Sequence, residues 1–267
     1  WAWPVSRNAI TRDGTTFVRT NQAFDEFGNP QEVVKSNTLG YSKSENFEYH
    51  NDAALWVLGQ IKRSATNGIE TSRSEHAWKA SPTKTYAFGK LQQTIGYYNS
   101  TGDLSHVIDG NNNLTAFFSW KRGIPQATNH ADGTSQYATV DDSGLVTSIR
   151  NEMGAQTCYE YDLMGRLARI VQSSEVEPPV TELGRCDTST WRDEIITFAP
   201  VQVDEHGLGP GHWTQRRRLG NRQVNTYFDA LWRPVLEESL DASDVAGTLS
   251  QVVKRYDANG RLIFQSY

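Results

Sequence analysis

The stretch Tyr161-Asp162-Leu163-Met164-Gly165-Arg166-Leu167 decides the fold, because glycines in the same setting recur upstream at a fixed interval. When the sequence is aligned on Gly165, the equivalent glycines are Gly144, Gly123 and Gly102, spaced 21 residues apart each time. Self-similarity at a fixed period is the signature of a repeat architecture. Four glycines in strict register are hard to explain by an ordinary β-sandwich with coincidental turns.

The shared unit is aromatic-Asp-x-x-Gly-polar-apolar, and its chemistry is that of a β-turn. The Asp side chain accepts hydrogen bonds from backbone N–H groups further along the turn, and the glycine takes a positive φ without strain. A type I turn followed by such a glycine is a common hairpin connection. Further copies lie at Phe24–Pro30 and Tyr256–Leu262, and a degenerate copy at Phe228–Pro234 has Trp232 in the glycine position. Each 21-residue repeat therefore corresponds to one β-hairpin.

An isolated hairpin is barely stable, so the repeats must pair edge to edge. We predict an all-β fold in which repeated hairpins form a long curved or spiralling antiparallel sheet. Residues 1–267 would be one repeat array, with a regular block at about 90–175 and no separate catalytic domain. The best helical candidate is Asn51–Leu58, where Asp52 could cap one short turn. The predicted repeat-turn residues are Asp25, Gly28, Gly102, Gly123, Asp141, Gly144, Tyr161, Asp162, Gly165, Arg166, Asp229, Tyr256, Asp257, Gly260 and Arg261.

The composition of the chain restricts the classes of partner that we expect it to bind. It has 267 residues, a net charge of −5 and 11% aromatic residues, so it can bury enough surface to fold. A mildly acidic chain is a poor binder of nucleic acid or anionic membranes. The longest purely apolar run, Ala53–Leu58, is far too short for a transmembrane helix. Nucleic acid and a membrane span are therefore excluded from the predicted partners.

Two segments carry a resemblance to a known family. Cys158–Leu167 resembles the tyrosine-aspartate repeat of Rhs/YD-repeat proteins, Y-x-Y-D-x-x-G-R-L, and Tyr256–Leu262 is a second close match. The copies at Gly123 and Gly144 depart from it, because Ser119 and Val140 stand where the tyrosine belongs. The resemblance extends from about Phe24 to the last residue. This family includes bacterial Rhs toxins, insecticidal toxin-complex cage subunits and teneurins.

The resemblance implies a structural role. In the bacterial members such repeats form a hollow shell around a C-terminal toxin, which is released by self-cleavage at a motif containing Asp-Pro. No Asp-Pro dipeptide occurs here. The run Arg261–Tyr267 has no stop signal, and we interpret the chain as a wall segment of a larger secreted or cell-surface protein, bacterial by resemblance. Its expected partners are neighbouring repeats of the same parent protein, an enclosed toxin polypeptide or a surface glycan.

No pattern in the sequence points to an enzyme. His206 and His212 flank a glycine-rich stretch whose spacing matches no standard metal site, and a polar loop is the preferred interpretation. The run Arg216, Arg217 and Arg218 is best explained by alternation along a strand. Asp109 begins a stretch similar to a calcium loop that lacks the final Glu, and it is interpreted as a tight turn. We expect no cofactor and no metal, and a hydrolytic enzyme remains a distant alternative.

Two sets of residues stay open at this stage. Cys158 and Cys186 could pair in an oxidising compartment, but two separate buried thiols are the preferred interpretation, because two cysteines do not make a disulfide framework. A carbohydrate- or surface-binding module is the alternative function, and packing between strands is the preferred role of the aromatic residues. The candidate glycan-contact residues are Trp56, Trp120, Trp213 and Trp232.

Overall fold

The computed structural model describes residues 4–77, 80–173, 182–186 and 192–266. Nearly all regular structure in these residues is β-strand, and the only α-helix among them is the four-residue α1, Val245–Thr248. The predicted all-β class of antiparallel hairpins is therefore confirmed. The chain divides into two compact units: Trp1–Phe118 with Asn129–Gly133, and Ser119–Thr128 with Thr134–Tyr267.

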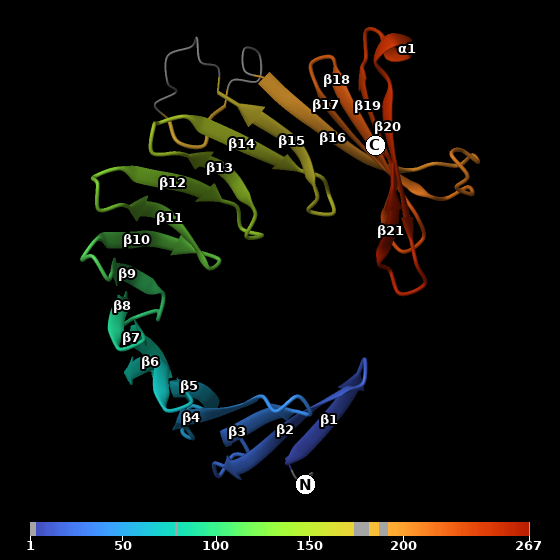
Figure 1. Ribbon diagram of the computed structural model, residues 1–267. Helices are drawn as coiled ribbons and strands as arrows, with labels where there is room; N and C mark the ends of the chain where they lie inside the picture. The colour runs from blue at the N-terminus through green and yellow to red at the C-terminus, as the bar shows by residue number, and fades with distance from the viewer. Residues whose placement is uncertain (1–3, 78–79, 174–181, 187–191, 267) are drawn as a thin grey trace. The chain divides into compact units, whose positions relative to one another are not determined.

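In the first unit each strand pairs antiparallel with its neighbour in the chain, in order from β1 through β10 (Figure 1). This is the pattern of hairpin after hairpin, without crossovers. The strands are β1 (Arg7–Arg12), β2 (Thr15–Phe24), β3 (Pro30–Asn37), β4 (Ser42–Asp52), β5 (Val57–Thr66), β6 (Ile69–Ala77), β7 (Ser81–Ala87), β8 (Lys90–Tyr97), β9 (Leu104–Asp109) and β10 (Leu114–Lys121), whose last residues belong to the second unit.

In the second unit, β12 to β21 pair antiparallel in chain order in the same way. The connections on either side of β16 are longer than the others, and α1 lies between β19 and β20. The strands are β11 (Ile124–Asn129), β12 (Ser135–Val140), β13 (Val146–Arg150), β14 (Gln156–Tyr161), β15 (Leu167–Gln172), β16 (Arg192–Pro200), β17 (Trp213–Leu219), β18 (Arg222–Phe228), β19 (Pro234–Asp241), β20 (Ser250–Tyr256) and β21 (Leu262–Gln265).

The 21-residue period corresponds to two strands and two turns, as predicted: its glycines follow β8, β10, β12 and β14. Gly102, Gly144 and Gly165 have φ of 85°, 90° and 76°, and the outlying Gly28 and Gly260 have φ of 85° and 79°. Gly123 also has a positive φ of 79°, but it lies in a two-residue turn with Arg122, whose φ is 52°. Gly123 keeps the register of the repeat while using a different hairpin turn.

The sheet buries few side chains. Among the described residues, eight apolar and five polar side chains are buried, and Val33, Val171 and Ser148 are the most fully enclosed. The helix expected at Asn51–Leu58 does not form, because β4 continues to Asp52 and β5 begins at Val57. Asp52 instead accepts a hydrogen bond from the backbone N–H of Leu55 within the turn. Among the described helices, none has the length and apolar character needed to cross a membrane.

Candidate functional site

The repeat turn is built around the carboxylate of Asp162. Its Oδ1 accepts hydrogen bonds from the backbone N–H groups of Met164 and Arg166, each at 2.9 Å, and its Oδ2 accepts from Arg166 Nε at 2.7 Å. The backbone N–H of Gly165 donates to the Asp162 carbonyl at 2.9 Å. The backbone N–H of Arg166 is the main cause of a lowered pKa of Asp162, which burial partly opposes. One side chain thus closes the turn that joins two strands.

The same arrangement recurs at eight turns in the described part of the chain. In each, the first residue accepts hydrogen bonds from the backbone N–H groups two and four residues further on. The alignment of the repeats within the sequence assigned five of these residues to the repeat. The sequence interpretation of Asp109 was a tight turn. Asn37 and Asn151 were missed, because an amide oxygen replaces the carboxylate in both. The eight residues are Asp25, Asn37, Asp109, Asp141, Asn151, Asp162, Asp229 and Asp257.

The tyrosine of the repeat joins neighbouring hairpins. Tyr161 donates its hydroxyl proton to the Val146 carbonyl at 2.8 Å, and Tyr256 donates to the Pro234 carbonyl at 3.0 Å. Tyr49 makes the same bond to Pro30 in the first unit, at 2.8 Å. Each acceptor lies two residues after the glycine position of the preceding turn. Each tyrosine therefore holds the end of its own strand against the residues that follow the preceding turn.

The strands β15 to β19 present two different faces. Cross-strand partners lie on the same face of a sheet, so the registers assign Phe198, Gln215 and Thr226 to one face. The opposite face carries Val171 on β15, together with Asn225 and Glu238, which pair across β18 and β19. Arg217 belongs to the first face while its neighbours Arg216 and Arg218 belong to the second, as strand alternation predicts. We call the first the open face and the second the covered face.

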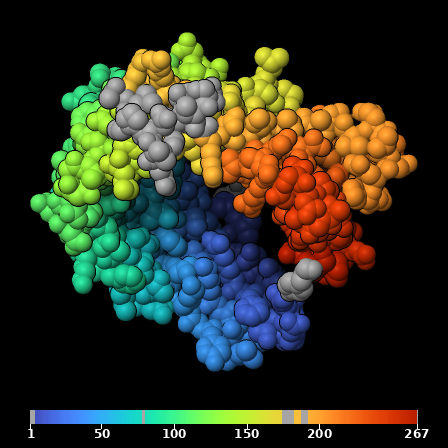
Figure 2. All heavy atoms as spheres, turned by 90° about the horizontal axis from the view of Figure 1, so that it is seen from above, coloured from blue at the N-terminus to red at the C-terminus, as the bar shows by residue number. Residues whose placement is uncertain are grey.

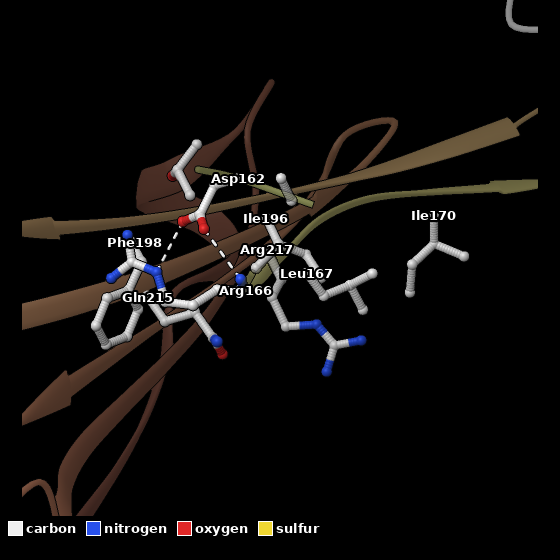
Figure 3. A pocket seen from close by; sticks show the side chains of 10 residues that line it. Asp162, Arg166, Leu167, Ile170, Ile196, Phe198, Gln215 and Arg217 are labelled. Atoms are coloured by element: carbon white, nitrogen blue, oxygen red, sulfur yellow. Dashed lines mark hydrogen bonds and ion pairs between the residues drawn. The ribbon is translucent and has the colours of Figure 1, made fainter. Parts of the chain in front are cut away.

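The open face holds a pocket of about 620 Å³ (Figure 3). Its apolar part is made by Ile170, Ile196 and Phe198 and by the aliphatic residues around them. At one side lies the Asp162–Arg166 pair of the repeat turn, with the Arg166 guanidinium 5.0 Å from the centre of the Phe198 ring. The pocket thus combines this apolar part with the polar groups of Asp162, Arg166, Gln215 and Arg217.

Aromatic rings gather at the turn end of the open face. Phe198 stacks on Trp213 at 5.2 Å and on Trp232 at 5.5 Å between ring centres, and the two indoles are 5.5 Å apart. Of the four candidate tryptophans, the structure thus brings together Trp213 and Trp232. Trp120 lies in β10, and Trp56 lies in the turn before β5 with 73% of its surface exposed.

Trp232 occupies a strained backbone position. It stands where the repeat has glycine, and its φ is 62°. This left-handed backbone conformation is energetically unfavourable for a bulky residue. Its side chain nevertheless remains 54% exposed. Strain of this kind persists where the surrounding structure or a function requires the residue.

The connection 201–212 packs on the covered face and projects beyond the end of β16 (Figures 1 and 2). The ring of His206 meets the Tyr227 ring at 4.7 Å, and its Nε2 lies 3.7 Å from a Glu238 oxygen. His212 is buried, and its Nδ1 lies 2.9 Å from the Gly209 carbonyl and its Nε2 3.3 Å from Glu205 Oε1. No group of three potential ligands among the described His, Cys, Asp and Glu residues is placed to hold a metal.

Glu238 is the centre of this buried polar cluster. Its carboxylate accepts hydrogen bonds from Gln251, Asn225 and Tyr227 at 2.9, 3.3 and 3.1 Å. Burial alone would raise the pKa of Glu238, but these hydrogen bonds lower it below its usual range. Burial, followed by the charge of Glu238, raises the pKa of Tyr227 to about 12. The cluster therefore holds a carboxylate that stays ionised and a phenol that stays protonated.

The two cysteines are bonded, which corrects the preferred interpretation of two separate thiols. Cys158 on β14 forms a disulfide with Cys186, which lies in the connection between β15 and β16. The expectation failed because this connection is not part of the repeat, and nothing local to Cys186 indicates that it returns to the sheet. Cys158, Cys186 and Val171 pack together on the covered face.

Comparison with known proteins gives a likeness of fold alone. No protein-family model matches the chain, and no curated protein matches it. The crystal structure of TcdB2-TccC3-TEV matches with a TM-score of 0.55 and 12% identity over 93% of this chain and 14% of that chain. The crystal structure of TcdB2-TccC3-Cdc42 has a TM-score of 0.49 and 11% identity, covering 98% and 17% of the two chains. The structure of the Photorhabdus luminescens Tc holotoxin pore has a TM-score of 0.45 and 11% identity, with the same coverage.

The first of these comparisons places the fold in a class. The chain shares its fold with a segment of the TcdB2-TccC3-TEV chain, and it spans about a seventh of the length of that chain. The repeated Asp turns and the tyrosine bonds between hairpins are the local features on which this fold rests here.

Proposed function

We propose that this chain is a wall segment of a larger Rhs/YD-repeat protein, whose β-shell encloses a toxin polypeptide and helps to deliver it. The observation that carries the proposal is the repeated turn together with the tyrosine bond to the preceding turn. This pair of contacts joins hairpins into a sheet without needing a thick core. The likeness of fold to the TcdB2-TccC3-TEV structure supports it.

The distribution of buried residues also supports a wall. A compact enzyme of this length has a continuous core, whereas the described residues here bury only thirteen side chains, five of them polar. A sheet one layer thick has two faces, so one can meet the enclosed polypeptide and the other can meet solvent. The proposal gives this segment no catalytic step and no cofactor, and its partners are neighbouring repeats and the enclosed chain.

The proposed location is outside the cytosol, either secreted or on the cell surface. Disulfides persist in oxidising compartments and are rare in the cytosol of most organisms. The Cys158–Cys186 bond is consistent with that location.

The proposal can be tested on the whole protein that contains this chain. Cryo-electron microscopy should show β2–β9 and β12–β21 as parts of a closed wall with polypeptide density inside it. The double variant Asp162→Ala/Asp229→Ala should make the enclosed polypeptide more sensitive to added protease, while Asp142→Ala, at an exposed position beside the turn residue Asp141, should not. A free-standing domain with no enclosed density, or equal protease resistance in all three proteins, would contradict the proposal.

A second candidate function is carbohydrate binding at the aromatic end of the open face. The specific observation is the exposed, strained Trp232 stacked beside Trp213 and Phe198, with Arg166 and Gln215 nearby to form hydrogen bonds. Flat aromatic faces beside planar polar groups suit the alternating apolar and hydroxyl surfaces of a sugar. The chain would then act as a surface-binding module.

A matched pair of variants tests this second candidate. Trp232→Gly and Trp56→Gly each remove an exposed indole from a residue with positive φ, so both relieve backbone strain. On an oligosaccharide array, binding should disappear in Trp232→Gly and remain in Trp56→Gly. Absence of binding by the wild-type chain, or equal loss in both variants, would exclude a glycan site at Trp232.

A further inference from the structure

The disulfide fastens a short segment to the covered face of the second unit. Residues 182–186, which we call the strap, lie in the connection between β15 and β16 and end at Cys186. The strap reaches across the sheet to β12, because a Cβ at Gly184 would lie 3.3 Å from Thr139 Cγ2 and 3.9 Å from Ser148 Oγ. It thus covers strands that are not its neighbours in sequence.

The side chains beneath the strap are among the most buried in the described structure. Ser148 and Val171 have no exposed surface, and Gln156 and Cys158 are 2% and 9% exposed. Ser148, Cys158 and Val171 form one cross-strand row on β13, β14 and β15. Two of these four residues are polar, so the strap buries hydrogen-bonding groups as well as a small apolar cluster.

The polar contacts of the strap with the sheet centre on one side chain. Gln156 Nε2 donates to the Arg185 carbonyl, and Gln156 Oε1 accepts from the Gly184 backbone N–H at 3.4 Å. The ion pair between Arg185 and Glu182 lies within the strap itself and does not tie it to the sheet. The apolar contact of the strap is Cys186 packed on Cys158 and Val171. Among the contacts between described residues, the covalent bond is therefore the strongest attachment of the strap to the sheet.

We propose that the strap is a redox-controlled clasp, closed by the Cys158–Cys186 disulfide and opened by a dithiol reductant. Cys186 is the more exposed of the two cysteines, so a thiolate of the reductant attacks its sulfur. The S–S bond breaks, and Cys158 leaves as a thiolate and takes up a proton. The second thiol of the reductant then displaces Cys186, so two electrons and two protons pass to the chain and the reductant becomes a disulfide.

Opening has a defined structural consequence. Without the covalent bond, the strap is held mainly by Gln156, whose hydrogen bonds to backbone can be replaced by water. Release exposes the row of Ser148, Cys158 and Val171. The covered face of β12–β15 is thus closed in an oxidising compartment and open in a reducing one. This inference does not depend on the shell function.

The test is hydrogen–deuterium exchange of the 267-residue chain with and without dithiothreitol, with alkylation and mass spectrometry to count free thiols. Reduction should raise the exchange rate of amides in 182–186 and in β13–β14 at least tenfold, and reoxidation should restore it. Peptides from β2–β3 should not change. The double variant Cys158→Ser/Cys186→Ser should exchange fast at the strap under both conditions.

Three outcomes would overturn the clasp. Two alkylated thiols with unchanged protection at 182–186 would mean that the strap is held without the disulfide. Equal loss of protection in β2–β3 would mean that the bond supports the folding of the whole chain. Failure to recover protection after reoxidation would mean that opening is not a reversible switch. Each outcome can be read from the wild-type chain alone, even if the serine variant does not fold.

Discussion

The hydroxyl of Tyr161 donates a hydrogen bond of 2.8 Å to the backbone carbonyl of Val146, which links the end of β14 to the start of β13. The acceptor follows the Asp141–Gly144 turn of the preceding repeat, so this bond fixes one turn against the next. Burial of the ring raises the pKa of Tyr161, as expected for a hydroxyl placed away from water.

Replacing Tyr161 with Phe should lower the free energy of unfolding by about 0.5–1.5 kcal/mol, because the Val146 carbonyl loses its donor. Tyr137→Phe is the matched control, since Tyr137 lies in β12 with 38% of its surface exposed and its hydroxyl has no hydrogen bond within the described residues. Urea denaturation of the two variants measures the difference. Equal losses would show that the tyrosine bond contributes nothing to the joining of repeats.

The adjacent residues Asp141 and Asp142 allow the effect of closing a turn to be compared with the effect of a surface charge. Asp141 accepts backbone hydrogen bonds from Ser143 and Leu145 at 2.9 and 2.8 Å, whereas the Asp142 side chain is 95% exposed and pairs with Lys121. Asp141→Ala should therefore cost about 1–2 kcal/mol of stability. Asp142→Ala should leave the thermal midpoint unchanged, because exposed ion pairs contribute little. Similar shifts in both midpoints would contradict the assigned role of Asp141.

Gly165 tests the backbone requirement of the turn by itself. A Cβ at this position would meet nothing within 4 Å, so any cost of substitution arises from the positive φ of 76° and not from a clash. Gly165→Val should destabilise by about 1–3 kcal/mol. Gly165→Asn should cost less, because Asn tolerates the left-handed region better than β-branched residues do. The opposite order in chemical denaturation would mean that the conformation of this turn does not limit stability.

The hairpin turns could be predicted from the sequence because their chemistry is local. The carboxylate of Asp162 accepts hydrogen bonds from N–H groups within the next four residues. The aspartate and the glycine at the fourth position of the turn are therefore enough to predict the turn. Asn37 and Asn151 were missed because an amide oxygen performs the same role as a carboxylate oxygen. Recognition of Asn in the first position would have found both.

The features that could not be predicted depend on the register of distant segments. The meeting of Trp213 with Trp232 requires knowledge of how β17 pairs with β18 and where the following turn ends. The Cys158–Cys186 bond requires the path of a connection that carries no repeat. The two faces of β15–β19 likewise follow from pairing, since the same alternating strands could be covered on either side.

We expect the stability of the first unit to depend on pH through His76. The rings of His50 on β4 and His76 on β6 stack in parallel at 4.6 Å, and neither His50 Nε2 nor His76 Nδ1, both buried, has a hydrogen-bond partner among the residues that the structure describes. Burial of the His76 ring, with smaller contributions from His50 and Lys62, lowers the pKa of His76 below its usual value of 6.5. The imidazole of His76 therefore binds a proton less readily in the folded chain than in the unfolded chain.

The lowered pKa of His76 determines how the free energy of unfolding changes with pH, because proton binding and folding are linked. Above pH 6.5 the imidazole of His76 is neutral in both states, so its contribution to stability is fully present. As the pH falls from 6.5 through the lowered folded-state pKa, the unfolded state binds more protons and the free energy of unfolding decreases. His76→Gln removes the titrating group and should flatten this decrease. Amide exchange of β4–β6 at pH 7.5 and pH 5.5 measures it for both proteins, and an identical pH dependence in wild type and His76→Gln would show that the stacked pair does not control it.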